Sequence, residues 1–418
     1  MDFATPKGMR DYSGPQMEMR EALLQAIAAK FRLYGFMPLD TPAIESLDTL
    51  SKKGGDEIEG QIFRIEESKM GLRFDLTVPM SRFAANTQIT PPFKRYALAK
   101  VWRREEPQKG RLREFIQADI DIVGSPSPMC EAELLACASE CLKAIGFEKF
   151  EIRLNSRVLI DSFLESAGIK DEAKQRKAMR IMDKQGKVSE KDMEAMLAAE
   201  FGAGSAGKIM EFISLKGNKQ VSAHCQEAGL EGISNLVEIL DGCKAFGIEP
   251  VLDMSLVRGL DYYTGAVFEI SASDKIGSVS GGGRYDSLIG TYGKPNPAVG
   301  ISLGFERIFA LIESGEVKPK FLHESHSMKA FVACMDAKNS GFAVKAAAKI
   351  RELGIPAAID LMGRKFPKQL EYASKAGFSH VAIIGDKEEK EASVSIKDLK
   401  TGKQKAVALA DLSKKDFQ

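Results

Sequence analysis

The chain has 418 residues, of which 44% are hydrophobic and 28% charged, the balance of an ordinary globular protein. Its 59 Lys and Arg residues nearly match its 58 Asp and Glu residues, and the net charge of +1 excludes a uniformly basic nucleic-acid coat protein and an acidic disordered chain. At about 150 residues per domain, this length predicts two or three domains. No stretch approaches the roughly 20 apolar residues of a membrane span, and the first residues lack the apolar segment of a signal peptide. We therefore expect a cytoplasmic location and no membrane partner.

The first part of the chain is typical of an antiparallel sheet with helices against one face. A helix is expected between Pro15 and Gly35, because apolar residues recur there at helical spacing. Alternating apolar and polar residues then predict strands, and a helix and a last strand complete this part. The predicted strands are residues 39–45, 62–65, 72–75, 96–102, 115–123 and 149–155, and the helix is residues 131–145.

The rest of the chain changes its pattern twice. Residues 156–250 have helical periodicity throughout and predict a helical insertion. Strands are expected again at 256–270, 277–280 and 299–303, followed by a helix over 305–314 and a linker. The last ninety residues alternate strand and helix, which predicts a small α/β domain with a largely parallel sheet. The expected fold is α+β, with four segments: 1–155, 156–250, 251–326 and 329–418.

Two motif-like features are interpreted as structural. Cys130, Cys137 and Cys141 share one face of a predicted helix, but no histidine lies nearby, so buried apolar packing is favoured over a zinc site. The run from Gly202 to Lys208 matches most of a phosphate-binding loop. Such a loop needs a preceding strand, whereas a helix is predicted there, so we interpret the run as a flexible connector between helices. With four histidines in the chain, a histidine-based nucleophilic triad has little support.

A local charge of +6 distinguishes residues 94–113, which hold eight basic residues against Glu105 and Glu106. Guanidinium groups on strands offer rigid forks for phosphate oxygens, so this segment predicts a site for a polyanion. A solvated basic hairpin is the alternative. The basic residues are Lys94, Arg95, Lys100, Arg103, Arg104, Lys109, Arg111 and Arg113.

Residues 256–265 place Arg258 and Asp261 beside Tyr262 and Tyr263 in a strand-like setting. A buried arginine is costly unless it pairs with a carboxylate or an anionic ligand. Two adjacent tyrosines supply an apolar wall with polar tips, which suits a flat polar ring. Structural packing of both tyrosines is the alternative.

Gly281-Gly-Gly-Arg-Tyr-Asp286 contains three successive glycines, which allow another group to approach closely unless the segment is a loose loop. Gly304-Phe-Glu-Arg307 is expected to join a strand to a helix. Arg307 in the first helical turn can face a phosphate beside the helix N-terminus.

Together these segments resemble the class II aminoacyl-tRNA synthetases. Pro42, Phe93-Lys-Arg95 with Arg103 and Arg111-Leu-Arg-Glu-Phe115, and Gly304-Phe-Glu-Arg307 resemble the three class II motifs. Residues 256–265 and 281–286 resemble the two signatures of the histidyl-tRNA synthetase family, and the likeness spans nearly the whole chain. It implies a six-stranded, mostly antiparallel catalytic sheet, an inserted helical domain, a C-terminal anticodon-binding domain, and a homodimer with the first helix and Pro42 at the interface.

The resemblance also implies roles for individual residues. ATP, with Mg²⁺, would contact Arg103, Arg111, Phe115 and Arg307. Histidine would contact Asp75, Thr77, Gln117, Asp121, Arg258, Tyr262 and Tyr263, with Asp121 and Tyr263 at the two imidazole nitrogens. Arg103 and Arg258 would be catalytic, Arg258 standing where other class II enzymes place a metal, and no metal site made of protein side chains alone is expected. The candidates for tRNA contact are Lys109, Arg364, Lys365 and Lys368, with a solvated basic face as the alternative.

Several positions depart from the common bacterial pattern. Asp75 and Asp121 each replace a glutamate, and Ala118-Asp119 replaces a Phe-Gly type pair. A non-catalytic relative, the histidine-sensing regulatory subunit of ATP phosphoribosyltransferase, is the competing interpretation. That relative typically lacks the anticodon-binding domain, and Arg103, Arg258 and Arg307 all stand here, so the expected partners are ATP, L-histidine and histidine tRNA.

Overall fold

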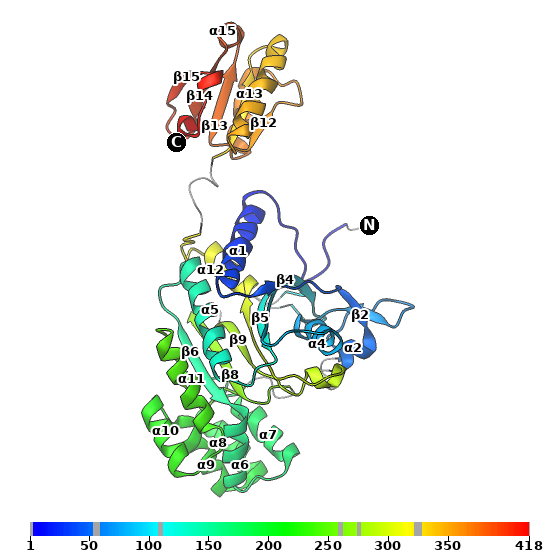
Figure 1. The fold of residues 1–418 in the computed structure, drawn as a ribbon, viewed down its shortest axis with the longest axis vertical. Coiled ribbons are helices and arrows are strands. Elements are labelled where there is room, and N and C mark those ends of the chain that lie inside the picture. The colour runs from blue at the N-terminus through cyan, green and yellow to red at the C-terminus, as the bar shows by residue number, and fades with distance from the viewer. Residues whose placement is uncertain are drawn as a thin grey trace. The chain divides into compact units, whose positions relative to one another are not determined.

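The computed structural model describes residues 3–52, 59–107, 112–257, 262–273, 277–321 and 328–417. The chain divides into two compact units, Met1–Phe321 and Leu322–Gln418, and each is described by itself (Figure 1).

A mostly antiparallel sheet forms the centre of the first unit. Its described strands follow the order β1-β4-β5-β10-β9-β8-β6-β7, and the six long inner strands are all paired antiparallel. The two-residue strands β1 and β7 pair in parallel at the edges, so the expected six strands are the inner ones. The strands are β1 (Met37–Pro38), β4 (Phe93–Trp102), β5 (Glu114–Val123), β6 (Glu151–Ser156), β7 (Val251–Leu252), β8 (Ala266–Ser273), β9 (Gly277–Arg284) and β10 (Ala298–Gly304).

Four helices cover one face of this sheet: α1 (Gly14–Leu33), α5 (Met129–Ile145), α11 (Ile233–Ala245) and α12 (Phe305–Glu313). Helix α5 packs in the middle, against α1, α11 and the strands β5, β9 and β10. Cys130, Cys137 and Cys141 are buried in its core-facing side, as predicted, with free thiols. Among the described residues, no group of His, Cys, Asp and Glu could hold a metal ion.

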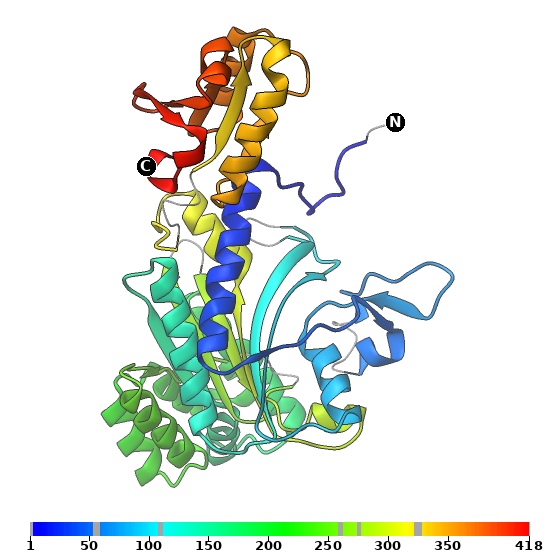
Figure 2. The ribbon, with the colours of Figure 1, turned by 45° about the horizontal axis from the view of Figure 1, so that its top comes forward.

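A smaller group of elements lies on the side of β4 and β5 away from α1 (Figure 2). It contains α2 (Leu47–Ser51), α4 (Thr77–Asn86) and the antiparallel pair β2 (Ile44–Ser46) and β3 (Met70–Leu72). The predicted strand at 62–65 is reduced to one isolated bridge between Arg64 and Gly71, because β3 pairs with β2 instead.

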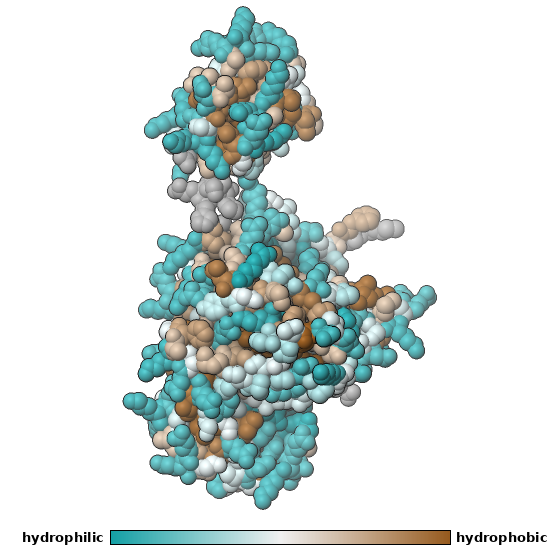
Figure 3. Space-filling model, viewed as in Figure 1, coloured by the Kyte–Doolittle hydropathy of each residue, from teal (hydrophilic) through white to brown (hydrophobic). Residues whose placement is uncertain are grey.

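Helices fill the segment between β6 and β7, as predicted for an insertion. They are α6 (Arg157–Ser166), α7 (Glu172–Met182), α8 (Glu190–Phe201), α9 (Ala203–Ser214) and α10 (Asn218–Glu227), followed by α11. Phe163 and Phe212 stack with ring centroids 3.8 Å apart in their core, and the face drawn at the bottom of Figure 3 is mostly hydrophilic. The expected flexible connector at 202–208 is wrong. Helix α9 begins at Ala203, and Gly202 with φ 82° forms the joint after α8.

The second unit contains the predicted elements, and a further helix and two further strands follow them. They are β11 (Ala330–Cys334), α13 (Ser340–Glu352), β12 (Ala357–Ile359), α14 (Phe366–Lys375) and β13 (His380–Ile384), then α15 (Asp386–Lys390), β14 (Ser393–Asp398) and β15 (Gln404–Ala408). Strands β12, β11 and β13 pair in parallel, whereas β14 and β15 extend the sheet antiparallel. The sheet is therefore mixed rather than largely parallel. In the part of the chain that the structure describes, no helix has both the length and the apolar character needed to cross a membrane.

Candidate active site

A pocket of about 350 Å³ opens between the strand ends and the start of α12. The residues at its wall come from the loop after β4 and from β5, β9, β10 and α12. The lining residues are Arg103, Glu105, Leu112, Phe115, Ile116, Gln117, Ser278, Val279, Ser280, Gly281, Ser302, Leu303, Gly304, Phe305, Glu306 and Arg307.

A second pocket, of about 170 Å³, continues from the first. The two share Arg103, Gln117, Gly281 and Ser302, so a ligand group at this junction contacts both. The second pocket has a smaller and more acidic lining. It is lined by Asp75, Thr77, Arg103, Gln117, Asp119, Asp121, Tyr262, Tyr263, Gly281, Tyr285, Gly300, Ile301 and Ser302.

Arg103 marks the junction and is held from two sides. Its Nε donates to the carbonyl of Phe74 over 3.0 Å, and its guanidinium carbon lies 5.0 Å from the centroid of the Phe115 ring. A guanidinium anchored through Nε keeps a planar fork in one orientation, which suits a carboxylate or a phosphate.

Arg307 and Glu306 shape the far end of the first pocket from the first turn of α12. Arg307 Nη1 donates to the carbonyl of Ser278 over 2.5 Å. Glu306 accepts two hydrogen bonds of 2.7 Å from Arg20 of α1, and its Oε1 lies 3.3 Å from the amide nitrogen of Ile116 on β5. The carboxylate of Glu306 therefore ties three elements together beside the pocket.

A buried ion pair forms the floor of the second pocket. Arg95 Nη2 lies 2.6 Å from Asp121 Oδ2, and the two side chains are 1% and 4% exposed. The Tyr285 hydroxyl donates to Asp121 Oδ1, and burial, followed by the charge of Asp121, raises the pKa of Tyr285 well above its usual value. Gly300 leaves room for this carboxylate, because a Cβ there would lie 2.0 Å from Asp121 Oδ1.

Asp75 lies at the entrance to α4, where its Oδ1 accepts from the amide of Val78 over 2.9 Å. This contact satisfies one of the free amides at the helix N-terminus and fixes the carboxylate next to Thr77. Both residues line the second pocket.

Tyr262 and Tyr263 form the aromatic side of the second pocket, with ring centroids 4.2 Å apart. The chain that carries them is tied down at Thr264, whose amide donates to the Arg284 carbonyl over 2.8 Å and whose hydroxyl accepts from the Asp286 amide over 3.0 Å.

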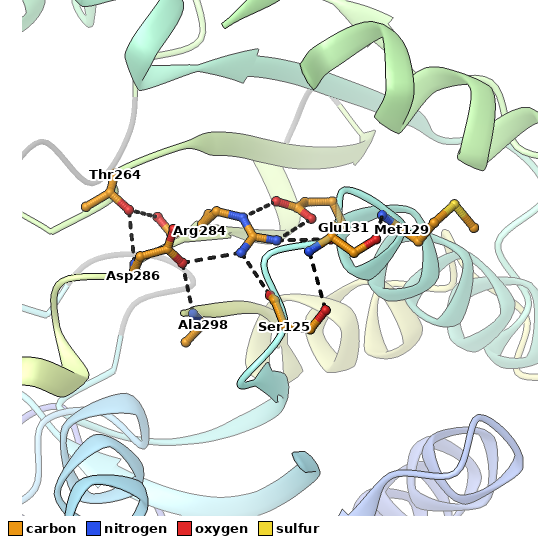
Figure 4. A network of polar contacts seen from close by, with 8 residues as sticks. Ser125, Met129, Glu131, Thr264, Arg284, Asp286 and Ala298 are labelled. Carbon is orange, nitrogen blue, oxygen red and sulfur yellow. Dashed lines mark hydrogen bonds and ion pairs between the residues drawn. The ribbon is translucent and has the colours of Figure 1, made fainter. Parts of the chain in front are cut away.

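Arg284 fixes that segment to α5 through a buried network (Figure 4). It donates to both oxygens of Glu131 over 2.6 and 2.7 Å, and to the carbonyls of Ser125 and Ser127 over 3.2 Å each. Burial disfavours the charge on Arg284, but Glu131 outweighs it and raises the pKa of the guanidinium. The pair of Arg284 and Glu131 holds the tyrosine segment in place against α5.

The structure brings most of the predicted site residues together. Arg103, Phe115, Gln117 and Arg307 line the first pocket, and Asp75, Thr77, Gln117, Asp121, Tyr262 and Tyr263 line the second. Lys109, Arg111 and Arg258 lie outside the described residues. The other three predicted tRNA contacts belong to the second unit: Arg364 precedes α14, Lys365 is its N-cap and Lys368 lies within it.

Asp119, Tyr285 and Ser302 are pocket residues that the sequence did not assign. Arg95 was predicted as part of the basic segment 94–113 for a polyanion, but it is buried at the pocket floor against Asp121. For Asp119 a signal was present. Strand alternation places it on the same face of β5 as Gln117 and Asp121. Arg95 lies opposite Asp121 on the adjacent strand. This pair could not be predicted, because the sequence does not give the register between β4 and β5.

Comparison with known proteins agrees with this geometry. The family model described as histidyl-tRNA synthetase matches residues 8–308, and that of an anticodon binding domain matches residues 329–415. The chain belongs to the histidyl-tRNA synthetase family. Histidine–tRNA ligases of Korarchaeum cryptofilum and Aeropyrum pernix are 39% and 38% identical to it, over 94% and 98% of this chain and 93% and 96% of their own lengths.

Solved structures of the family have the same fold. The histidyl-tRNA synthetase of Nostoc sp. PCC 7120 superimposes with a TM-score of 0.86 at 29% identity, covering 100% of this chain and 99% of that one. A Bacillus halodurans structure described as an ATP phosphoribosyltransferase regulatory subunit/histidyl-tRNA synthetase gives a TM-score of 0.76 at 18% identity, over 90% and 97% of the two chains. That likeness concerns the fold alone.

Proposed function

We propose that the chain is a histidine–tRNA ligase. It activates L-histidine with ATP to histidyl-adenylate, releasing pyrophosphate, and transfers histidine to the 3′ end of its tRNA. One observation carries this proposal: a larger pocket with arginines at both ends joins a small acidic pocket at Arg103. Activation joins a carboxylate to an α-phosphate, and the junction of the two pockets is where these groups meet.

In this scheme ATP occupies the first pocket. Its α-phosphate lies at Arg103, its adenine against Phe115, and its γ-phosphate at Arg307. Arg111 is a further nucleotide contact. The anchored guanidinium of Arg103 stabilises negative charge that develops when the histidine carboxylate attacks the α-phosphorus. Arg258 is proposed to stabilise the same developing negative charge, because it matches the catalytic arginine of the family.

Histidine occupies the second pocket. Asp75 and Thr77 hold its α-ammonium group, and Gln117 is a neighbouring contact. Asp121 and Tyr263 bind the imidazole nitrogens, with Tyr262 beside them. The ion pair with Arg95 and the Tyr285 hydroxyl support the proposal, because they fix Asp121 as an acceptor at the pocket floor. A site that hydrogen-bonds a polar ring rejects apolar amino acids of similar size, which would leave its buried polar groups unpaired.

Mg²⁺ enters with ATP as part of the substrate. The described lining of the first pocket fits a metal ion that is held by the phosphates of ATP rather than by the protein. It includes two carboxylates, Glu105 and Glu306, and Glu306 is already paired with Arg20. What Mg²⁺ supplies is neutralisation of phosphate charge during displacement of pyrophosphate. The protein itself neutralises phosphate charge through the arginines named above.

The second unit is assigned to tRNA, with Arg364, Lys365 and Lys368 as candidate contacts and Lys109 as a candidate in the first unit. Lys365 is exposed, and Lys368 lies 2.7 Å from Glu371 at the surface. Arg364 is partly committed to the fold, since it lies 2.6 Å from Asp360 and stacks on Tyr372 at 4.3 Å. We therefore rank Lys365 and Lys368 above Arg364.

A homodimer is supported by apolar side chains that stay exposed on the first unit. Leu33, the last residue of α1, is 77% exposed, and Met37 on β1 is 56% exposed. Ile44 on β2 and Met70 on β3 are each 45% exposed. Hydrophobic side chains gather over β2 and β3 in Figure 3. Such patches mark association surfaces. The four segments 1–155, 156–250, 251–326 and 329–418 are the proposed domain limits, and the cytoplasm is the proposed location, where translation uses charged tRNA.

The competing function is a histidine-sensing regulatory subunit without catalysis. The anticodon-binding match at residues 329–415 favours the ligase, because a sensor that never meets tRNA has no use for such a domain.

Histidine-dependent exchange of pyrophosphate into ATP tests the proposal. We expect exchange with histidine and Mg·ATP, and none above background with the other standard amino acids. Histidine binding without exchange would instead identify the sensor. As a control, Arg103→Ala is expected to abolish exchange and to leave the unfolding midpoint near that of the unchanged chain.

A further inference from the structure

Asp119 is a carboxylate in the second pocket that the scheme above leaves without a role. It lies between Gln117 and Asp121 on the same face of β5, and all three line the pocket. Its neighbours in the sheet are small: it pairs with Ala97 on β4 and with Ser302 on β10. Ala97 offers the carboxyl group no hydrogen bond, so Ser302 is the one sheet neighbour with a side chain that contacts it.

The hydrogen bonds of Asp119 are incomplete although the residue is 4% exposed. Its Oδ1 is buried without a hydrogen-bond partner, and its Oδ2 lies at 3.5 Å from Gln117 Nε2. Asp121, in contrast, has Arg95 and the Tyr285 hydroxyl. A buried acceptor without a donor costs on the order of 1–3 kcal/mol, so a donor brought by a ligand stabilises the complex.

The charges around Asp119 do not balance. Asp75 and Arg103 are matched by the ammonium and carboxylate groups of a bound amino acid in the proposed complex. Among the residues that the structure describes, Asp119 and Asp121 then face one buried cation, Arg95, which leaves one negative charge in excess within that set. The groups facing Asp119 are Gln117 and Asp121 on β5, Arg95 and Arg103 from β4, Ser302 on β10, Tyr285 after β9, Asp75 before α4, and Tyr262 and Tyr263.

This imbalance affects the ionisation of Asp119. Burial raises its pKa to about 7, and the charges of Asp121 and Asp75 add to the effect against the opposing influence of Arg95 and Ser302. The carboxyl group therefore gains or loses its proton in the range in which imidazole also titrates. A ligand that displaces water from this small pocket disfavours the ionised form further.

We propose that Asp119 is a specificity-determining residue that shares one proton with the ring of bound histidine, so that histidine binds with uptake of a proton from solution when Asp119 is ionised. A neutral imidazole has a single N–H to donate, so it cannot satisfy Asp119 and Asp121 when both carboxylates are ionised. One proton, on the ring or on Asp119, removes that conflict. The Tyr263 hydroxyl both donates and accepts, so it remains compatible with either form. This inference rests on the proposed function and adds Asp119 to Asp121 and Tyr263 as a ring-recognition residue.

Calorimetric titration of histidine into the full chain at pH 8 tests this, in two buffers of different ionisation enthalpy. At this pH a group with a pKa of about 7 is mostly ionised, so we expect an uptake of roughly nine-tenths of a proton per histidine bound. Asp119→Asn should reduce the uptake to near zero. Asp411→Asn, the same change at an exposed position, should keep the uptake of the unchanged chain.

A second readout is the KM for histidine in the exchange assay. The KM of the unchanged chain should rise by up to about tenfold per pH unit above pH 7, relative to Asp119→Asn, because one proton is bound with the substrate. Dividing by the variant's KM removes the titration of the amino group of free histidine. A merely structural role would change KM by the same factor at every pH.

Binding of histidine without proton uptake in the unchanged chain would overturn this inference and leave the proposed function standing, and that result needs no variant to fold. Equal uptake in the unchanged chain and in Asp119→Asn would also overturn it. If histidine gives no binding at all, the proposed function and this inference fail together.

Discussion

At the scale of single residues, buried partners orient the side chains at the two pockets. Arg95 holds Asp121, Arg20 holds Glu306, and Arg284 holds the tyrosine segment through Glu131. The motifs predicted the residues that face ligands, because strand and helix positions set their direction. The partners were not predictable, since Arg20 and Glu306 lie 286 positions apart and their contact exists only in the folded chain.

Glu306→Gln tests the importance of such a partner. Arg20 lies among the rings of Tyr12, Phe305 and Phe309, with its guanidinium 3.8 to 5.0 Å from their centroids. Loss of the carboxylate leaves a buried arginine without its counter-charge, and we expect the free energy of unfolding to fall by about 3 kcal/mol. The KM for ATP should rise, because the first turn of α12 and β5 lose their common anchor. Denaturant unfolding and exchange kinetics measure the two effects.

The matched control is the double variant Arg20→Met with Glu306→Gln. A methionine fits among the three rings and removes the stranded charge, so the double variant should be more stable than Glu306→Gln alone. Strictly additive losses of stability in the two single variants would show that the pair is not coupled.

At the scale of elements, the glycines of β9 permit close strand packing. The sequence indicated that some group must approach this run closely, and the group proves to be the protein itself. A Cβ at Gly282 would lie 2.0 Å from the carbonyl oxygen of Gly300 and 2.7 Å from Cα of Ile301. At Gly283 it would meet the Tyr263 ring at 2.9 Å. The glycines thus let β9 and β10 form the back of both pockets.

Gly282→Ala is expected to destabilise the first unit severely, because the clashing atoms are backbone and cannot rotate away. Gly207→Ala is the control. This glycine lies in α9 with nothing within 4 Å of an added Cβ, so alanine should stabilise the chain by about 0.5–1 kcal/mol. The melting temperatures of both variants, measured by thermal unfolding, test these two expectations. Similar melting temperatures for the two would contradict the packing account.

Elements with strong periodicity were predictable, and short ones were not. The helical periodicity predicted for residues 156–250 is confirmed in α7, Glu172–Met182, where an amphipathic face and the cap Asp171 define the helix. Strand β15 was missed, because its residues Gln404–Ala408 are mostly exposed and include few β-branched side chains. It forms only because β14 offers it an edge.

At the scale of the whole molecule, the chain consists of two units with separate cores. The first contains both pockets, and its core joins α1, α5, the sheet and the helical segment. The second has its own buried clusters around β11 and β13. A net charge of +1 gave no indication of a polyanionic substrate, because acidic residues elsewhere cancel the basic segment at 94–113. Sequence motifs, rather than composition, predicted the function.

The central claim is that this chain attaches histidine to tRNA, and the most direct measurement is tRNA charging. The full chain is incubated with total tRNA, Mg·ATP and all standard amino acids, and the amino acid esterified to tRNA is identified by mass spectrometry. A chain ending at Phe321 is run in parallel. We predict histidine alone on histidine tRNA with the full chain, and strongly reduced charging by the shortened chain with pyrophosphate exchange retained. Histidine binding by the full chain without any charged tRNA, or charging with another amino acid, would contradict the account.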